Sequence, residues 1–423
     1  QRCNLDCTLC YLSESAEAVR DFPLEEVFRR IDMIHAHYGA NTDVQVSGGE
    51  PTLRKRSELV AIVARIAGLG MRASLFTNGI KATRSLLAEL CSAGLTDVAF
   101  HVDTTQERIG FPDESSLNAL RGDYLERARG LPLAVFFNTT VHAGNFDAVP
   151  MLAAWFVAHA DAVRFASFQL QAETGRGVLG ARMADLIGNE SVASRLRQGS
   201  GVATLQFNVL AAGHHDCNRT AVLLVVNGKA HDAMADAPFV RRFMRETNAL
   251  RIDRDTPWRA LRSLTRGALT QPRLALASAR WVLAWAWRLR HDLLAARFRV
   301  HKLTLFTHNF MDACHLDSDR LDACVFMAIT QDGPLSMCSY NARRDEFLLR
   351  PLHTAGGTWQ PLRPGSGNAV ANALPGVPIR WLKGRPRAAA LQARRTASAP
   401  AAAAATSAVA PATAAASDAS EPQ

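Results

Sequence analysis

The sequence lacks both a recognisable signal peptide and an apolar run of about 20 residues, so neither export nor a membrane span is expected. It is also poor in cysteine. Eight thiols among 423 residues are too few for a secreted disulfide scaffold, and their clustering favours metal or cluster ligation in a reducing cytosol. Acidic residues are outnumbered by basic ones, 39 to 48, and the net charge of +9 indicates anionic partners such as phosphates, nucleic acid or a membrane surface. The chain is 48% hydrophobic, which is enough to bury a large core in two or three domains of a cytoplasmic protein.

Three cysteines lie within the first ten residues, in the segment QRCNLDCTLCY. Cys3, Cys7 and Cys10 have the spacing C-x3-C-x2-C. Three thiolates this close can wrap one face of a [4Fe–4S] cluster, and they leave one iron open because such clusters normally take four thiolates. A zinc knuckle or a disulfide fragment is the alternative interpretation of the spacing alone. Since a cluster-binding loop usually follows a strand, we expect that strand to lie upstream of residue 1, in a part that this chain lacks.

Strand and helix patterns alternate from the cysteine segment to about residue 180. Helical spacing of apolar residues covers 24–38, 57–70, 82–94 and 149–160, and strand-like segments cover 43–47, 72–76, 96–102, 131–141 and 162–170. This alternation is typical of an α/β fold with a parallel sheet and right-handed crossovers, in which the upstream strand would be the sixth.

Polar and glycine-rich segments follow these strands where each strand ends. SGGEP, TNG and the aspartate of HVDTT stand at three such ends, and an asparagine stands near the end of a fourth. Each glycine could simply form a turn. Because the carboxyl ends of parallel strands share one edge of a sheet, four such ends together predict a ligand site there.

These motifs resemble the radical S-adenosylmethionine (SAM) superfamily over residues 1 to about 180. The resemblance implies a partial (β/α)6 TIM barrel without its first strand, whose three cysteines hold a [4Fe–4S] cluster. In that family SAM chelates the fourth iron, one electron cleaves it reductively, and a 5′-deoxyadenosyl radical abstracts hydrogen from an unactivated carbon. An electron donor such as flavodoxin or ferredoxin is the implied partner.

The resemblance also assigns site residues by position. The cluster ligands would be the three cysteines above. SAM would be bound at the strand ends and beside the cluster, by Gly48, Gly49, Glu50, Pro51, Asn78, Asp103, Asn138 and Tyr11. The GGE segment would face the SAM ammonium, for which a carboxylate is a good acceptor. For the last four of these residues, a structural role is the alternative.

A second group of cysteines lies in the C-terminal half. Cys217 is in a GHHDC segment, and Cys314, Cys324 and Cys338 lie within residues 308–341. Together they give four thiols, the count for a fully ligated auxiliary [4Fe–4S] cluster, although zinc and separate core thiols also fit. The remaining thiol, Cys91, lies in a helical pattern and is predicted to be a small buried hydrophobe.

The C-terminal segments are similar to those of a radical SAM subgroup that includes the tetraether lipid synthases and the methanopterin ring-methylating enzymes. The similarity rests on GH-x2-C, HNFMD, R-x3-C and DG-x4-C-x2-N. It implies an auxiliary cluster and a lipid or isoprenoid substrate, with methylation or C–C bond formation in lipid biosynthesis. Those relatives also carry cysteine pairs ahead of the core motif, and this chain has none.

Two alternative functions remain open at this point. One is a radical SAM enzyme that matures a peptide or a cofactor and holds it with an auxiliary cluster. The other is a non-catalytic protein that binds zinc or nucleic acid, but it leaves SGGEP and the strand-end pattern without explanation. Nucleic acid is therefore not an expected partner.

The segment 274–300 predicts one amphipathic helix. Its apolar side would carry Leu274, Trp281, Trp285, Leu289 and Leu293, and its other side Arg273, Arg280 and Arg288. Such a helix suits the interface of a membrane, which would make the protein peripheral there, or it packs as an ordinary helix on the barrel. The arginines exclude a comfortable transmembrane span.

The sequence loses its periodicity near Leu362, and the alanine-rich end is predicted to be disordered. We therefore expect four parts: a radical SAM core at 1–180, a helical basic extension at 181–300, an auxiliary iron–sulfur region at 301–361 and a disordered tail at 362–423.

Overall fold

The computed structural model describes residues 2–5, 7–12, 19–174, 176–177, 186–210, 212–248, 257–354 and 356–362. The predicted disordered tail lies outside the described residues except for Leu362, which forms an isolated bridge with Val19.

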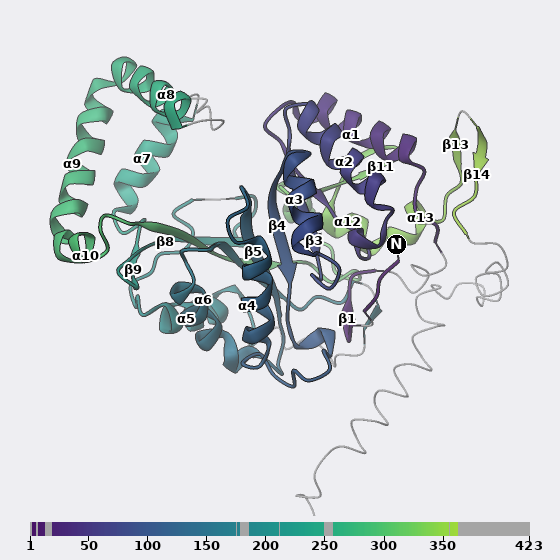
Figure 1. Cartoon of the computed structure of the whole chain (residues 1–423), viewed down its shortest axis with the longest axis horizontal. Coiled ribbons are helices and arrows are strands. Elements are labelled where there is room, and N and C mark those ends of the chain that lie inside the picture. The colour runs from purple at the N-terminus through teal and green to yellow at the C-terminus, as the bar shows by residue number, and fades with distance from the viewer. Residues whose placement is uncertain are drawn as a thin grey trace, which may run out of the picture.

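A mixed, mostly parallel sheet forms the centre of the fold (Figure 1). Its strands run in the order β2 (Asp43–Val46), β3 (Arg72–Thr77), β4 (Leu95–His101), β5 (Ala134–Val141), β6 (Val163–Leu170), β10 (His301–Asn309), β8 (Asn218–Val226) and β9 (Lys229–Asp232). The first six strands in this order are parallel to one another. The last two, β8 and β9, each pair antiparallel to the strand before them in the sheet. The predicted α/β class is confirmed, and β2 and β9 stand at the two ends of the described sheet rather than pairing with each other.

Helices connect the parallel strands as the 3.6-residue periodicity predicts. They are α1 (Leu24–Tyr38), α2 (Arg56–Gly68), α3 (Arg84–Ser92), α4 (Leu117–Ala128), α5 (Val149–Ala158) and α6 (Asn189–Ser200). Their apolar faces cover the sheet, so that Leu87 and Phe156 are almost wholly buried together with Val98 and Phe137 of the strands. Burying such side chains contributes about 1.5–3 kcal/mol each relative to exposure.

The sixth parallel strand is β10, which comes late in the chain. It pairs with β6 from Thr304↔Phe165 to Asn309↔Leu170 and with β8 on its other side. The predicted boundaries at residues 181 and 301 are therefore wrong as divisions of the sheet, because β8 and β10 both belong to it. Leu303 and Leu305 of β10 are fully buried, which explains why this segment joins the core.

A helical arm extends from the β9 end of the sheet (Figure 1, upper left). It contains α7 (Ala237–Thr247), α8 (Pro257–Thr270), α9 (Pro272–Arg288) and α10 (Arg290–Ala295). The predicted single helix over 274–300 is thus interrupted at Leu289. Trp281 stacks on Phe239 of α7, and Trp285 packs with Val226 of β8, so the predicted apolar side faces the protein, as an ordinary packed helix would.

The C-terminal region consists of short elements that return to the start of the sheet. They are α11 (Ser318–Asp322), β11 (Met327–Thr330), β12 (Gly333–Ser336), α12 (Met337–Ala342), α13 (Arg344–Leu348), β13 (Leu352–Thr354) and β14 (Gly357–Trp359). Arg30 of α1 donates from Nη1 to the carbonyl of Ile329 in β11 at 3.3 Å. This return brings Cys324 and Cys338 towards the N-terminal segment. None of the described helices has both the length and the apolar composition needed to cross a membrane.

Candidate functional site

The N-terminal cysteine loop lies on the carboxyl ends of β2, β3 and β4. The carbonyl of Arg2 accepts a hydrogen bond from the Glu50 backbone N–H at 2.7 Å, after β2. The side chain of Asn4 accepts from Asn78 Nδ2 at 2.7 Å, after β3. Thr8 donates its backbone N–H to the carbonyl of Thr105 at 2.8 Å, after β4. Three strand ends therefore hold one loop. The loop continues into β1 (Leu9–Cys10), which pairs with β7 (Arg176–Gly177).

The three thiols of this loop are partly buried and lie near one another. Burial, followed by the neighbouring thiol of Cys10, by Asp103 and by the thiol of Cys3, raises the pKa of Cys7 far above the usual cysteine value. Three thiols on one loop can bind either an iron–sulfur cluster or a zinc ion.

Glu50 is the most heavily bonded residue of the SGGEP segment. Its buried carboxylate, 4% exposed, accepts from the backbone N–H and hydroxyl of Thr52, from Thr77 Oγ1 at 2.7 Å and from Asn78 N at 2.7 Å. These bonds join the end of β2 to the end of β3. Gly48 has φ +147°, which side-chain-bearing residues rarely adopt. The contact of Gly48, Gly49 and Glu50 with a SAM ammonium stays a prediction, and the observed role of Glu50 is to brace two strand ends. Pro51 follows it and begins the short helix η1 (Pro51–Leu53).

Asp103 is fully buried below the cysteine loop. Its carboxylate accepts from His101 Nε2 at 2.6 Å, from Thr105 N at 3.0 Å and from Thr140 N at 2.7 Å. Burial alone would raise the pKa of Asp103, but His101 and these hydrogen bonds hold that pKa well below its usual range. Conversely, burial would lower the pKa of His101, and Asp103 more than offsets this and raises it. Asn138 lies beside the pair, with Nδ2 at 3.3 Å from His101 Nδ1. Asp103 therefore acts in this structure as an internal anchor for the strand ends, and its predicted contact with SAM stays a prediction.

Asn78 links the cysteine loop to the strand ends. Besides its bond to Asn4, its Nδ2 lies 4.0 Å from Cys3 Sγ. Its carbonyl accepts from Tyr124 Oη at 3.1 Å and from Arg108 Nη2 at 2.6 Å. The side chain of Asn78 is thereby fixed next to the predicted cluster.

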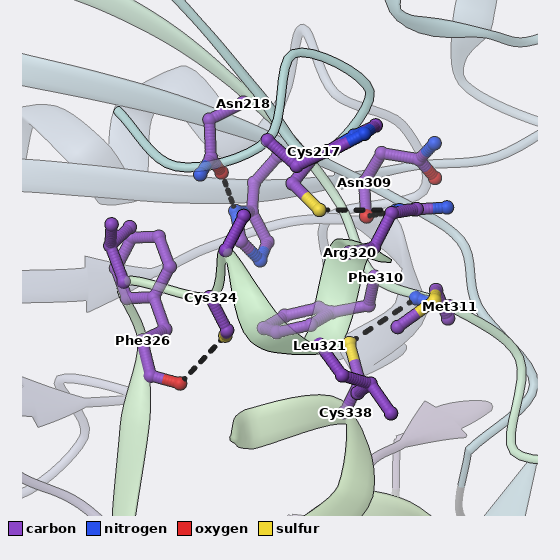
Figure 2. Close-up of a pocket in the computed structure, with 14 residues that line it drawn as sticks. Cys217, Asn218, Asn309, Phe310, Met311, Arg320, Leu321, Cys324, Phe326 and Cys338 are labelled. Atoms are coloured by element: carbon purple, nitrogen blue, oxygen red, sulfur yellow. Dashed lines mark hydrogen bonds between the residues drawn. The ribbon is translucent and has the colours of Figure 1, made fainter. Parts of the chain in front are cut away.

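A second pocket lies next to this site and contains three of the four late cysteines (Figure 2). Cys217, Cys324 and Cys338 line it, and Arg320 donates from Nε to Cys217 Sγ at 3.3 Å. The backbone N–H of Met311 donates to Cys338 Sγ at 3.5 Å. Burial, with smaller effects of Cys324 and Cys217, raises the pKa of Cys338. Hydrogen bonds donated to sulfur suit thiolates that bind a cluster, because such bonds tune the reduction potential of the cluster.

The two sites are connected by an aromatic contact. Tyr11, directly after Cys10, has its ring centroid 5.5 Å from that of Phe310, which lines the second pocket. Tyr11 was predicted to lie near the cluster and the adenine of SAM. The structure places it between the two groups of cysteines.

Cys314 does not lie with the other late cysteines. It is exposed, its sulfur is 3.1 Å from Nδ1 of His315, and it is absent from the lining of the pocket. The predicted set of four thiols is therefore not assembled in the described structure. The reason is that the segment between Met311 and α11 turns outward to solvent. Cys91 is half-buried rather than fully buried on α3.

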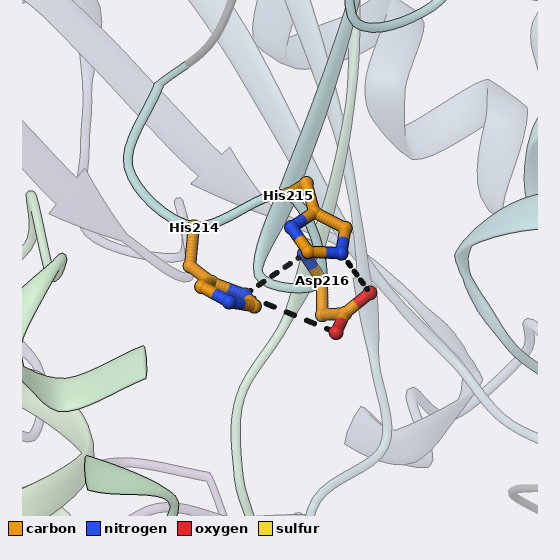
Figure 3. A group of neighbouring side chains, drawn as sticks. All are labelled: His214, His215 and Asp216. Atoms are coloured by element: carbon orange, nitrogen blue, oxygen red, sulfur yellow. Dashed lines mark hydrogen bonds and ion pairs between the residues drawn. The ribbon is translucent and has the colours of Figure 1, made fainter. Parts of the chain in front are cut away.

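A glycine allows the GHHDC loop to pack closely against the segment that precedes Cys324. Gly213 has φ +73°, and a Cβ there would lie 2.8 Å from the carbonyl oxygen of Ala323. The loop also carries a group of His214, His215 and Asp216 (Figure 3). Asp216 lies 3.4 Å from His215 Nε2 and 3.9 Å from His214 Nδ1. His215 and Asp216 are exposed, whereas His214 is partly buried and lines the second pocket.

Several residues of both sites escaped the sequence analysis. His101, Asn218, His308 and Arg320 were not singled out, although HVDTT, HNFMD and R-x3-C drew attention to their segments. His308 lines the second pocket, and burial, together with Arg320, lowers its pKa to about 3, so it is neutral. Asn218 directly follows Cys217. The sequence signal for Asn218 is its position directly after Cys217, and that for His308 is its place in the HNFMD segment.

Comparison with known proteins finds similarity over the N-terminal part of the chain. Residues 1–145 match the Radical SAM superfamily. A PqqA peptide cyclase of Methylobacterium nodulans is 34% identical over 113 residues, which cover 26% of this chain and 29% of that protein. The 7,8-dihydro-6-hydroxymethylpterin dimethyltransferase of Methanocaldococcus jannaschii is 27% identical over 180 residues, covering 41% of this chain and 35% of that protein. The chain thus spans about a third of the length of these curated relatives.

Among solved structures, Streptococcus suis SuiB bound to the precursor peptide SuiA is similar over 41% of this chain and 38% of that one, with 16% identity and a TM-score of 0.32.

Proposed function

We propose that this chain, which belongs to the radical SAM superfamily through residues 1–145, binds a [4Fe–4S] cluster at Cys3, Cys7 and Cys10 and uses it to cleave SAM reductively. The observation that carries the proposal is the docking of the cysteine loop on three strand ends, through Glu50, Asn78 and Thr105. When bound, the cluster supplies one electron to SAM, giving methionine and a 5′-deoxyadenosyl radical that takes a hydrogen atom from the substrate. The electron comes from a donor of the flavodoxin or ferredoxin class.

The roles of the protein residues in this proposal are binding and orientation. The Glu50 and Asp103 carboxylates keep the strand ends in register, because each accepts hydrogen bonds from two segments. Asn78 stands beside Cys3, so its amide would lie near a cluster bound by that thiol. The GGE segment, Pro51, Asn138 and Tyr11 complete the proposed SAM site. Preorganised polar groups of this kind favour one bound geometry of the reacting atoms.

An auxiliary iron–sulfur cluster in the second pocket is part of the proposal. Three thiols, a guanidinium bond to sulfur and a backbone N–H bond to sulfur support it. The position of this pocket, one aromatic contact away from Tyr11, suits a cluster that binds substrate or passes electrons during the reaction. We expect about eight irons per chain after anaerobic reconstitution, from two cubane clusters.

For the substrate we propose a lipid or isoprenoid chain, alkylated or joined at an unactivated carbon. The exposed apolar and arginine-rich arm supports this choice, since it gives the protein a surface for lipid. A peptide substrate is the second candidate, and it is supported by the similarity to a PqqA peptide cyclase. The two candidates differ in which extract supports turnover.

The experiment is an anaerobic incubation of the reconstituted chain with SAM, dithionite and either a lipid extract or a peptide extract. Mass spectrometry would quantify 5′-deoxyadenosine and detect a product with a new mass. A lipid product supports the first candidate, and a modified peptide replaces it with the second. Absence of 5′-deoxyadenosine in every mixture would refute the radical SAM activity itself.

A further inference from the structure

His308 is a buried histidine whose position is fixed by two strands. It lies near the end of β10, opposite Asn218 at the start of β8, and only 7% of the residue is exposed. Cys217 precedes Asn218 directly, and its carbonyl accepts a hydrogen bond from Asn309 N at 2.7 Å. His308 therefore comes to the pocket from β10, and Cys217 from the loop residue directly before the neighbouring strand β8.

Hydrogen bonds determine which nitrogen of His308 carries the proton. Asn218 donates from Nδ2 to the carbonyl of Ala212 at 2.7 Å, so its Oδ1 is the atom that faces the imidazole. His308 Nδ1 is within hydrogen-bond distance of this Oδ1 and must be the donor, because an amide oxygen only accepts. With the proton placed on Nδ1 by this bond and no acceptor facing Nε2 in the described structure, Nε2 is the nitrogen that carries the lone pair.

That lone pair has no hydrogen-bond partner in the described structure. Nε2 of His308 is buried and unsatisfied, in a pocket that Cys217, Cys324 and Cys338 also line. The rings of Phe310 and Phe326 lie 4.0 and 4.8 Å from the imidazole and offer no donor. An unsatisfied buried acceptor is unfavourable, and a bound metal would remove this cost. The bond from Nδ1 to an amide oxygen is also the usual support of a metal-bound histidine.

We propose that Nε2 of His308, and not the thiol of Cys314, is the fourth ligand of an iron–sulfur cluster held by Cys217, Cys324 and Cys338. This inference rests on the auxiliary cluster of the proposed function. A neutral imidazole in place of a thiolate makes the cluster less negative by one charge, which raises its reduction potential.

The test uses the full chain with Cys3, Cys7 and Cys10 all changed to alanine, so that only the auxiliary cluster remains. We expect about four irons per chain and a reduced cluster whose pulsed EPR spectrum contains a strong coupling to 15N in histidine-labelled protein. His308→Ala should abolish that coupling. Cys314→Ala, the matched control, should leave the iron content and the coupling unchanged.

A second variant keeps the test independent of folding. His308→Cys should retain about four irons, lose the nitrogen coupling and have a lower reduction potential than its parent, because it restores a fourth thiolate. A 15N coupling that persists in His308→Ala, or that is lost in Cys314→Ala, would overturn the assignment. Zinc in place of iron in the chain that lacks only Cys3, Cys7 and Cys10 would overturn it as well. These outcomes are separate from failure of SAM cleavage, which is measured in the chain that retains Cys3, Cys7 and Cys10.

A different observation concerns the surface of the arm. Leu276, Leu283 and Trp287 are 57%, 68% and 71% exposed and are spaced by seven and four residues on α9. At 3.6 residues per turn they form one stripe, on the side away from the packed residues Trp281 and Trp285. Leu294 of α10 and Phe298, which follows α10, are also exposed. Exposed apolar groups in line on a helix indicate a binding surface.

Arginines border the stripe. Arg290 stacks on Trp287, 4.7 Å from the ring centroid, and Arg273 and Arg280 are exposed on α9. Apolar and aromatic side chains flanked by arginine match an anionic bilayer, where the rings enter the interface and the guanidinium groups contact phosphates. From this complementarity we infer that the stripe docks on an anionic lipid surface.

Co-sedimentation with phosphatidylcholine vesicles, with and without phosphatidylglycerol, tests this inference. The protein should bind the anionic vesicles, and Leu283→Glu with Trp287→Glu should weaken binding by at least about tenfold. Val282→Glu with Leu276 and Trp287 intact is the matched control, because Val282 is exposed but about a third of a turn from the stripe. Equal binding by all variants, or no binding to anionic vesicles, would contradict the proposal.

Discussion

Replacing Gly79 by alanine should destabilise the protein more than its backbone conformation alone requires. Gly79 has φ +80°, a left-handed conformation that costs alanine about 1–2 kcal/mol. A Cβ at this position would also lie 2.2 Å from the ring of Tyr124, which is almost wholly buried and cannot move freely. Overpacking of this kind costs about 1–3 kcal/mol. The sum predicts that the free energy of unfolding falls by about 2–5 kcal/mol.

Gly130 provides a matched control. Its φ is +76°, and a Cβ there would meet no atom within 4 Å, so Gly130→Ala should cost only the backbone part of about 1–2 kcal/mol. Urea unfolding of both variants under anaerobic conditions measures the difference. Tyr124→Leu combined with Gly79→Ala should recover part of the loss, because it makes room for the new methyl group. Equal destabilisation by Gly79→Ala and Gly130→Ala would refute the reasoning.

Two further predictions concern the buried groups below the site. Arg121 is fully buried and paired with Glu114, so Arg121→Met should lower the free energy of unfolding, measured with urea, by about 3–5 kcal/mol. Glu114→Gln added to this variant should recover part of the loss, because it removes the unpaired buried charge. A loss below about 1 kcal/mol for Arg121→Met would contradict the prediction. The His101–Asp103 pair should stabilise the folded protein most between about pH 4 and 6.5. The contribution of Asp103, whose pKa is lowered on folding, is lost only when the pH falls below the unfolded pKa of about 3.9. The contribution of His101, whose pKa is raised on folding, is lost as the pH rises above about 6.5 and through the raised pKa. The difference in unfolding free energy between the parent and Asp103→Asn should therefore shrink from pH 6 to pH 9, and a constant difference would count against the pair.

The sequence predicted the parallel part of the fold well, because each element there is local. The helix over 24–38 coincides with α1, and the five predicted strands correspond to β2 to β6 within a few residues. It did not predict β10 as the sixth parallel strand. A buried strand at 301–309 has no local feature that identifies its neighbour, and only packing against β6 decides the pairing.

The site was predictable in part for the same reason. Cys3, Cys7 and Cys10 are adjacent in sequence, so their common role could be inferred from spacing. The partners of Cys217 come from segments about a hundred residues away, and Cys314 was grouped with them although it faces solvent. His308 became visible only when β8 and β10 were placed side by side.

The helix of the arm shows a related limit of pattern reading. Both of its sides carry apolar residues, and the sequence alone left open whether the side with Trp281 and Trp285 faces a membrane or packs on the protein. The structure buries this side against α7 and β8 and exposes the stripe with Leu283 and Trp287 instead. Which of two apolar sides is packed depends on the partner element.

The most direct test of the radical SAM proposal is the formation of 5′-deoxyadenosine from SAM and dithionite by the Cys7→Ala variant. Cys7 belongs to the loop held by three strand ends, and removal of its thiol takes away one of three ligands from the proposed cluster. Cys91→Ala, which removes a thiol from α3 far from this loop in sequence, should retain the activity of the parent chain. We predict no 5′-deoxyadenosine from Cys7→Ala, whereas formation at the rate of the parent would contradict the proposed role of this cluster.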